Sequence, residues 1–337
     1  MSVAAAQKKK LNRPLPWRTA GLYLLTLWAV VTLNFLIPRL MPGDPVLALL
    51  DPASGNYLTD QQIRQEVEAY YGLDQPLPVQ YTNYLGRLLR GNLGTSIHLK
   101  EPVAKLIAIH LPWTLLLMIP ALVISSLVAL FLGAHAGWVR GSPLDRSLLV
   151  LFLGLWNMPV FFLGLLLLLF FGVQWQIFPI AGAVTRFQQY GSWLDWLLDV
   201  LYHLVLPLTA LTLSMIGGRF LLMRNTMVSV LGQEFMVVAR AKGLSPQVIK
   251  YRHGMRNAVL PFFTVFATQM GLAVTGSIFI ESLFAYPGMG LMMFEAVGRR
   301  DYPLLDGTFL VISLAVLLAN LAADIFYVFL DPRVSAQ

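Results

Sequence analysis

The sequence contains six apolar runs of about twenty residues, and these runs limit the folds that the chain can adopt. A helix of that length crosses a hydrocarbon core of about 30 Å, whereas the strands of a membrane barrel alternate apolar and polar residues over about ten positions. Hydrophobic residues make up 57% of the 337-residue chain and charged residues 12%, compared with about 25% charged residues in soluble domains. The pattern therefore predicts an all-α polytopic membrane protein with six transmembrane helices. The six runs cover residues 22–40, 113–134, 148–173, 200–223, 259–279 and 308–330.

An even number of spans places both termini on one side of the membrane, and lysine and arginine residues near span ends are retained in the cytoplasm. With the N-terminus inside, fifteen of the 24 basic residues are cytoplasmic. We therefore expect a multi-pass protein with both termini in the cytoplasm. The first run is too long for a signal peptide and lacks a small-residue cleavage site, so we interpret it as a retained helix. The fifteen residues are Lys8, Lys9, Lys10, Arg13, Arg18, Arg140, Arg146, Arg219, Arg224, Arg240, Lys242, Lys250, Arg252, Arg256 and Arg333.

The predicted organisation places a long external segment between the first two spans. This segment is long enough to fold as a small lobe at the outer mouth, and it contains a predicted helix that starts at Thr59 or Asp60 and ends before Gly72. The remaining five helices form a core that includes a long cytoplasmic loop. The predicted divisions are a basic tail at 1–20, the first transmembrane helix at 21–41, the external lobe at 42–105, and the core at 106–337 with its loop at 225–258.

The cytoplasmic loop is the most polar and basic part of the C-terminal half. Its first stretch, "QEFMVVARAK", predicts a helix that ends at Gly243, where a positive φ costs a glycine least. Ser245 is a predicted N-cap, and Pro246 occupies the first helical position, where its missing N–H does no harm. We therefore expect a helix-turn-helix that lies along the membrane surface and is suited to docking.

Motifs for catalysis or cofactor binding are absent from the sequence. The dipeptide Gly-Lys never occurs, which excludes a phosphate-binding loop of the Walker type, and neither HExxH nor GxSxG is present. The five histidines include no i, i+4 pair, and there is no cysteine. We predict no catalytic residue, no metal site and no cofactor in this chain. The net charge of +7 is spread over positions near the membrane, so it does not indicate nucleic-acid binding.

Two ionisable residues fall within apolar spans, where charged groups are costly. Arg219 lies near the inner end of the fourth span and Asp324 near the inner end of the last. Either side chain could reach the interface. We favour a structural role, such as an ion pair between a carboxylate and an arginine on the cytoplasmic side, over a proton or ion relay.

Eight motifs occur in the order typical of one family. The chain closely resembles the permease subunits of ATP-binding cassette (ABC) importers of type I, in the dipeptide, oligopeptide and nickel subfamily, and in particular its first permease subunit. The loop motif resembles the EAA-type loop of these permeases, although Val237 and Val238 stand where the general consensus has glutamate and alanine. The motifs are "PGDP" at 42–45, "YGLDQPLPVQY" at 71–81, "GNLGTS" at 91–96, "MPVFFLG" at 158–164, "ARAKGLS" at 239–245, "YPGMG" at 286–290, "RDYP" at 300–303 and "LDPR" at 330–333.

The resemblance implies a permease of a bacterial-type inner membrane that forms half of a translocation pathway for peptides or similar small solutes. It implies four partners: a second homologous permease, two cytoplasmic ABC ATPases and an extracytoplasmic solute-binding protein. ATP and magnesium would be bound by the ATPases, and no substrate-binding residue can be assigned. The residues implied for ATPase coupling are Ala239, Arg240, Ala241, Lys242, Gly243, Leu244, Ser245, Arg252, His253, Arg256, Asn257, Leu260 and Pro261.

Three alternatives remain open at this point. The solute could be nickel, another metal chelate, a sugar or a different small molecule. A self-sufficient secondary transporter would also lack nucleotide chemistry, but it would be expected to show an inverted repeat and charges at mid-depth in the membrane. A membrane-embedded hydrolase would need a paired nucleophile and base, and the sequence shows no such pair.

Overall fold

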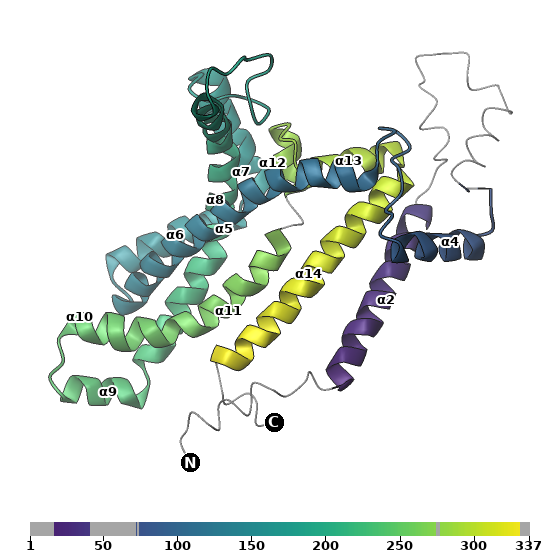
Figure 1. The fold of residues 1–337 in the computed structure, drawn as a ribbon. Helices are drawn as coiled ribbons and strands as arrows, with labels where there is room; N and C mark the ends of the chain where they lie inside the picture. Colours follow the sequence, from purple (N-terminus) through teal and green to yellow (C-terminus); the bar gives the residue numbers. More distant parts are fainter. Residues whose placement is uncertain (1–16, 41–71, 73, 274–276, 331–337) are drawn as a thin grey trace. The chain divides into compact units, whose positions relative to one another are not determined.

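The computed structural model describes residues 17–40, 72, 74–273 and 277–330, and this part of the chain is mainly helical (Figure 1). The chain divides into two compact units. The first comprises Met1–Ala104 and Ala296–Leu317, and the second comprises Lys105–Glu295 and Leu318–Gln337. The predicted helix at 59–71 and the predicted lobe up to residue 71 lie outside the described residues. Gly72, predicted to follow that helix, has a φ of +67°.

The first unit contains α2 (Trp17–Leu40), α4 (Leu77–Leu89) and the beginning of α14 (Tyr302–Leu330). Aromatic and aliphatic side chains from all three helices form its core. The ion pair between Arg39 and Asp306, with Nη1 and Oδ2 3.1 Å apart, joins α2 to α14. Both side chains are largely buried, so each neutralises a charge that would be costly alone. The buried core residues are Val31, Phe35, Tyr84 and Leu310.

A buried aspartate connects two of the sequence motifs in the first unit. Asp301, from "RDYP", accepts hydrogen bonds from the backbone N–H groups of Ile97 and His98, each at 3.1 Å, and from the hydroxyl of Ser96. It also accepts the N–H of Leu304 at 3.2 Å, in the first turn of α14. The "GNLGTS" turn and the start of α14 are therefore held together by one carboxylate.

The second unit is built around α8 (Trp193–Leu231), whose residues between 203 and 224 include no exposed side chain. The helix α5 (Val103–Trp138) runs parallel to it, because Gly133 lies against Met223 and Gly137 lies against Met227. A Cβ atom at either glycine would approach a backbone atom of α8 to within 2.9 Å. These two glycines therefore permit the close approach of α5 and α8.

The helix α6 (Pro143–Asn157) runs antiparallel to α8. Phe152 stacks on Phe220 with ring centroids 4.7 Å apart, and Asp145 at the start of α6 pairs with Arg224 further along α8. A Cβ at Gly217 would lie 2.5 Å from the carbonyl oxygen of Phe152, so Gly217 allows the two helices to touch. The helices α5, α6 and α8 therefore alternate in direction.

The predicted third span is not one continuous helix. α6 ends at Asn157, and α7 (Val160–Leu167) with the π-helix η2 (Leu168–Gln174) follows at a bend of 99°. Pro159 causes the break because it has no N–H to donate and because its ring excludes the helical conformation of the preceding residue. Met158 accordingly has φ −80° and ψ 130°.

Two further span predictions are corrected. The fourth span, predicted at 200–223, is part of a longer helix, because α8 begins at Trp193 and continues unbroken to Leu231. Ser192 caps this helix by accepting the N–H of Asp195 at 3.3 Å. The predicted fifth span at 259–279 is covered by α11 (Arg256–Leu272) only as far as residue 272, and Phe279 belongs to α12 (Ile278–Leu283).

In the part of the chain that the structure describes, three helices are long and apolar enough to cross a membrane, or four if the bent pair counts as one span. The long helices are Gly21–Leu40, Val103–Trp138 and Trp193–Leu231, and the bent pair is Pro143–Asn157 with Val160–Gln174. The chain is therefore a helical membrane protein. α13 (Met289–Arg299) completes the described helices that are longer than ten residues.

Candidate functional site

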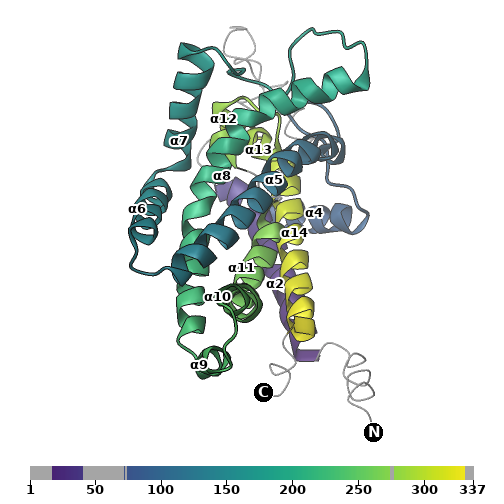
Figure 2. The ribbon, with the colours of Figure 1, turned by 90° about the vertical axis from the view of Figure 1, so that its left-hand side faces the viewer.

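The loop predicted at 225–258 is shorter in the structure, because α8 continues to Leu231 and α11 begins at Arg256. The remainder of this loop lies at one end of the second unit, opposite the segment that joins η2 to α8 (Figure 2). It contains α9 (Glu234–Ala241), α10 (Pro246–Val248) and the π-helix η3 (Ile249–Met255). The predicted helix-turn-helix is confirmed, with one difference. The second helix does not end within the loop, because α10 continues through η3 directly into α11.

The first helix of the loop has two apolar faces. Met236 and Ala239 are buried against residues near the end of α8. Val237 and Val238, on the other side, are 63% and 53% exposed, and Phe235 is also exposed. Because α9 lies outside the predicted spans, these exposed side chains form an apolar surface that the loop itself does not cover.

The turn between the helices has the geometry that the sequence predicts. Gly243 has a φ of +71°, and its N–H donates to the carbonyl of Arg240 at 2.9 Å. A Cβ at this glycine would meet no atom within 4 Å, so the requirement for glycine comes from backbone conformation alone. Ser245 caps α10 by accepting the N–H of Val248 at 3.5 Å, and Pro246 follows at the first helical position.

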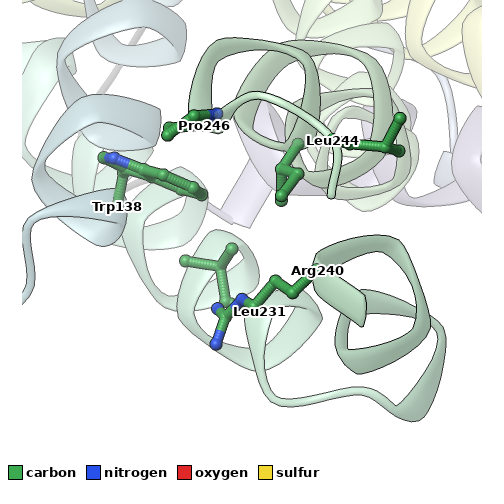
Figure 3. A pocket seen from close by; sticks show the side chains of 6 residues that line it. Trp138, Leu231, Arg240, Leu244 and Pro246 are labelled. Atoms are coloured by element: carbon green, nitrogen blue, oxygen red, sulfur yellow. The ribbon is translucent and has the colours of Figure 1, made fainter. Parts of the chain in front are cut away.

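An open pocket of about 390 Å³ lies beneath this turn (Figure 3). Trp138 comes from the end of α5, Leu231 from the end of α8, and the other side chains come from α9, the turn and the start of the following helix. The pocket is therefore formed where two long helices meet the loop. Its lining residues are Trp138, Leu231, Arg240, Leu244, Pro246 and Ile249.

Two polar contacts fix the loop and its neighbours to the helices. The Nζ of buried Lys250 lies 2.6 Å from the Nδ1 of His135, in the last turn of α5. Since an ammonium group has no acceptor, His135 accepts at Nδ1. On α8, Arg224 binds Asp145 through two hydrogen bonds of 2.6 and 2.8 Å, a bidentate arrangement that fixes both side chains. The Lys250 contact therefore joins the loop to α5, and the Arg224 contact joins α8 to α6.

The predicted coupling residues fall into two groups. Most are exposed, whereas Ala239 is buried and His253 is partly buried, with its carbonyl accepting the amide of Asn257 at 2.6 Å. Arg256, Asn257, Leu260 and Pro261 belong to α11 and not to the turn. The exposed members are Arg240, Ala241, Lys242, Gly243, Ser245, Arg252, Arg256, Asn257, Leu260 and Pro261, and Leu244 is partly buried.

Sequence reasoning missed the residues that anchor the loop. His135 and Trp138 lie about one hundred residues earlier in the chain, and no local pattern connects them with the loop. Met236 could have been found, because it occurs three residues before Ala239 on a short amphipathic helix.

These features define a helical membrane protein whose loop, outside its long helices, exposes an apolar surface. Residues 126–336 match the family described as "Binding-protein-dependent transport system inner membrane component". The chain belongs to this family, as the resemblance of its motifs predicts.

Relatives that match along nearly their whole length have consistent names. A di/tripeptide transport system permease protein DppB of Pseudomonas aeruginosa (strain UCBPP-PA14) is 34% identical over 95% of this chain and 98% of its own. A putative peptide permease protein of Brucella suis biovar 1 (strain 1330) is 38% identical over 91% of this chain and 94% of its own. An oligopeptide transport system permease protein AppB of Bacillus subtilis (strain 168) is 33% identical over 91% of this chain and 95% of its own.

Proposed function

We propose that this chain is a permease subunit of an ABC importer and forms half of a translocation pathway for peptides. The observation that supports this most directly is the exposed α9 surface beside the Gly243 turn, which is built to receive a partner. The chain's family consists of inner-membrane transport components, and the relatives named above are peptide permeases. The same relatives favour peptides over nickel, metal chelates or sugars as the solute.

In this proposal the 225–258 loop docks on a cytoplasmic ABC ATPase. The loop contacts α5 through Lys250 and continues into α11, so a displacement of the docking surface would act on two helices at once. Two such permeases would rock between inward-open and outward-open states, and ATP binding by the partner ATPases would favour one state. The full assembly would contain a second homologous permease, two ATPases that bind ATP and magnesium, and an extracytoplasmic solute-binding protein.

The membrane topology is part of the proposal. The six apolar runs predict six spans, and the distribution of lysine and arginine residues predicts that both termini and Gly243 lie in the cytoplasm. The segment at 42–105 would then face outward as a lobe that contacts the binding protein. A single cysteine introduced at position 243 of this cysteine-free chain tests the topology. We expect an impermeant thiol reagent to label it in opened cells but not in intact cells, and labelling in intact cells would contradict the topology.

Reconstitution separates this function from a self-sufficient transporter. The chain is placed in proteoliposomes with its partner permease, ATPases and peptide-loaded binding protein, and uptake of a radiolabelled dipeptide is measured with and without ATP. We expect uptake only when ATP and the ATPases are present. Peptide flux through the chain without any ATPase would overturn the proposal.

A further inference from the structure

Arg219 is buried in the second unit, and its side chain points away from the inner end of α8. Its Nη1 donates to the hydroxyl of Ser125 on α5 at 3.1 Å and to the carbonyl of Met215 at 3.1 Å. Met215 precedes Arg219 by four residues, so the guanidinium lies about one turn closer to the N-terminal end of α8 than its own Cα. Arg219 therefore does not reach toward the inner interface, and the side chain of Asp324 lies outside the described part of the structure.

The two hydrogen-bond partners give the same depth for this guanidinium. Met215 is eight residues from Met223, the predicted inner end of the fourth span, which corresponds to about 12 Å along a helix. Ser125 is nine residues from Ala134, the predicted inner end of the second span, which corresponds to about 13 Å. Both values place the charge well within a hydrocarbon core of about 30 Å.

The buried charge has no acidic partner in the described part of the chain. No described carboxylate forms an ion pair with Arg219, and its enclosed Nε has no hydrogen-bond partner there. A desolvated cation is costly unless an anion neutralises it, and charges kept at such depth mark functional sites. A guanidinium has five N–H donors, so Arg219 retains donors for an anion from outside the chain.

Two hydroxyl groups on α5 and α8 are also enclosed and have no hydrogen-bond partner among the described residues. Thr212 precedes Arg219 by seven residues, which places it on the same face of α8 within about 20°, in the direction in which the guanidinium extends. Ser126 follows Ser125 on α5. Six enclosed side-chain atoms of the described residues have no hydrogen-bond partner, and three of them belong to Ser126, Thr212 and Arg219. A cation beside hydroxyl donors matches a carboxylate, which only accepts hydrogen bonds.

We propose that Arg219, Thr212 and Ser126 form a transient intramembrane site for the carboxylate group of the transported peptide. This inference rests on the proposed function and extends it by naming the chemical group that the chain recognises. Every peptide with an unmodified C-terminus carries this carboxylate, so one site of this kind serves peptides of different sequence. The charge-assisted hydrogen bonds replace the water that the carboxylate loses when it enters the membrane.

The packing of α5 and α8 indicates how the site opens. Gly133 and Gly137 hold the two helices in backbone contact on the inner side of Arg219. A tilt of α5 about this contact separates the helices on the outer side, where Thr212 and the guanidinium lie. The site is closed in this structure and becomes accessible when the permease rocks between its two states.

The substitution Thr212→Val tests the site without threatening the fold, because it removes a buried hydroxyl that has no partner. We expect its melting temperature in the assembled complex to equal or exceed that of wild type. ATP-dependent uptake of a free dipeptide should fall by roughly 2- to 10-fold, the effect of one lost hydrogen bond. Ser126→Ala should also reduce this uptake, but by a smaller factor. Unchanged uptake in both variants would overturn the proposal.

The matched control is Ser214→Ala, also on α8, because the Ser214 hydroxyl already donates to the carbonyl of Leu211 at 2.8 Å. We expect wild-type uptake from this variant. An equal loss of uptake in the control and in Thr212→Val would show that any hydroxyl change on α8 impairs transport, and it would overturn the assignment.

Arg219→Gln and Arg219→Lys test the charge with two probes, a free dipeptide and the same dipeptide as a C-terminal amide. Uptake of the free dipeptide is divided by uptake of the amide, for the variant and for wild type with the same binding protein, so that selection by that protein cancels. We expect this ratio to fall at least tenfold in Arg219→Gln and by a smaller factor in Arg219→Lys. An unchanged ratio, or recovery of Arg219→Gln by a second substitution Asp324→Asn, would overturn the proposal. If wild type itself shows no ATP-dependent uptake, the proposed function fails instead.

Discussion

The second unit contains two glycine turns that need glycine for opposite reasons. At Gly243 the surroundings are empty, and only the φ of +71° requires glycine. At Gly288 and Gly290, in "YPGMG", neighbouring atoms occupy the space that a side chain would need. A Cβ at Gly288 would overlap the carboxylate of Glu281 and lie 2.7 Å from the hydroxyl of Thr114, and one at Gly290 would lie 2.8 Å from Glu281 Oε2.

The carboxylate of Glu281 explains why the second turn is so crowded. It is fully buried and accepts hydrogen bonds from the N–H of Leu291 at 3.0 Å, the N–H of Ser277 at 3.3 Å and the hydroxyl of Thr114 at 3.1 Å. Burial raises the pKa of Glu281, which lies outside the predicted spans. The carboxylate beside this turn finds its hydrogen-bond partners within the chain, whereas the Gly243 turn leaves its apolar neighbours exposed. The comparison indicates that the glycines of "YPGMG" serve the fold, and it agrees with the proposal that the Gly243 turn serves a partner.

Gly288→Ala should have the largest effect. The added methyl group must displace a buried carboxylate or Thr114, and overpacking of this kind costs about 1–3 kcal/mol of folding free energy, or more. We expect a melting temperature several degrees below wild type for the detergent-solubilised complex, and reduced insertion in cells.

Gly298→Ala provides the control for that substitution. Gly298 lies within α13, and a Cβ there would meet nothing within 4 Å. Alanine favours a helix over glycine by about 0.5–1 kcal/mol, so this variant should match or exceed the stability of wild type. Equal destabilisation by both substitutions would show that crowding around Glu281 is not the reason for the glycine.

Lys250 tests how firmly the exposed loop is joined to the buried helices. Lys250→Met and His135→Leu each remove one partner of the 2.6 Å contact and leave the other without it. We expect each single variant to take up less peptide per ATP hydrolysed, and the double variant to be less impaired than the two effects combined, with a coupling energy of about 0.5–3 kcal/mol. Additive effects in this double-mutant cycle would show that the contact does not couple the loop to α5.

Much of the exposed loop could be predicted from sequence, because local rules determine it. The glycine at the end of α9, the Ser245 cap and Pro246 each depend on neighbours within a few residues. A kink at Pro159 is also expected from sequence, since proline restricts the residue before it. The size of the bend could not be predicted, because the apolar run continues across it without interruption.

The long-range contacts could not be predicted. His135 meets Lys250 across 115 residues, Ser125 meets Arg219 across 94, and Thr114 meets Glu281 across 167. A hydrophobic pattern reports only that a helix is apolar, and it carries no information about which polar side chains on different helices meet. The motifs could therefore be recognised in the sequence, but the contacts that require them could not. "RDYP" and "GNLGTS" belong together because of Asp301.

Charge reversal beside the Gly243 turn should have a smaller effect than the changes above. Arg240 and Lys242 are exposed, so exchanging both for glutamate leaves the fold intact. We expect weaker association with the ATPase, with the largest difference from wild type at low ionic strength, because salt screens exposed charges. Co-purification at two salt concentrations measures this. Equal binding by the variant and wild type at low salt would show that these charges do not face the partner.

The most direct test of the account compares Gly243→Val with Gly243→Asn in the assembled complex. Asparagine tolerates a positive φ, whereas a β-branched residue resists it, and the empty surroundings exclude a steric clash in either case. ATP-dependent peptide uptake and ATP hydrolysis are measured together in proteoliposomes. We expect Gly243→Asn to retain uptake close to wild type, and Gly243→Val to insert normally but lose uptake, with ATP hydrolysis lost or no longer linked to transport. Wild-type uptake by Gly243→Val would show that the loop is only a connector and would contradict the central claim.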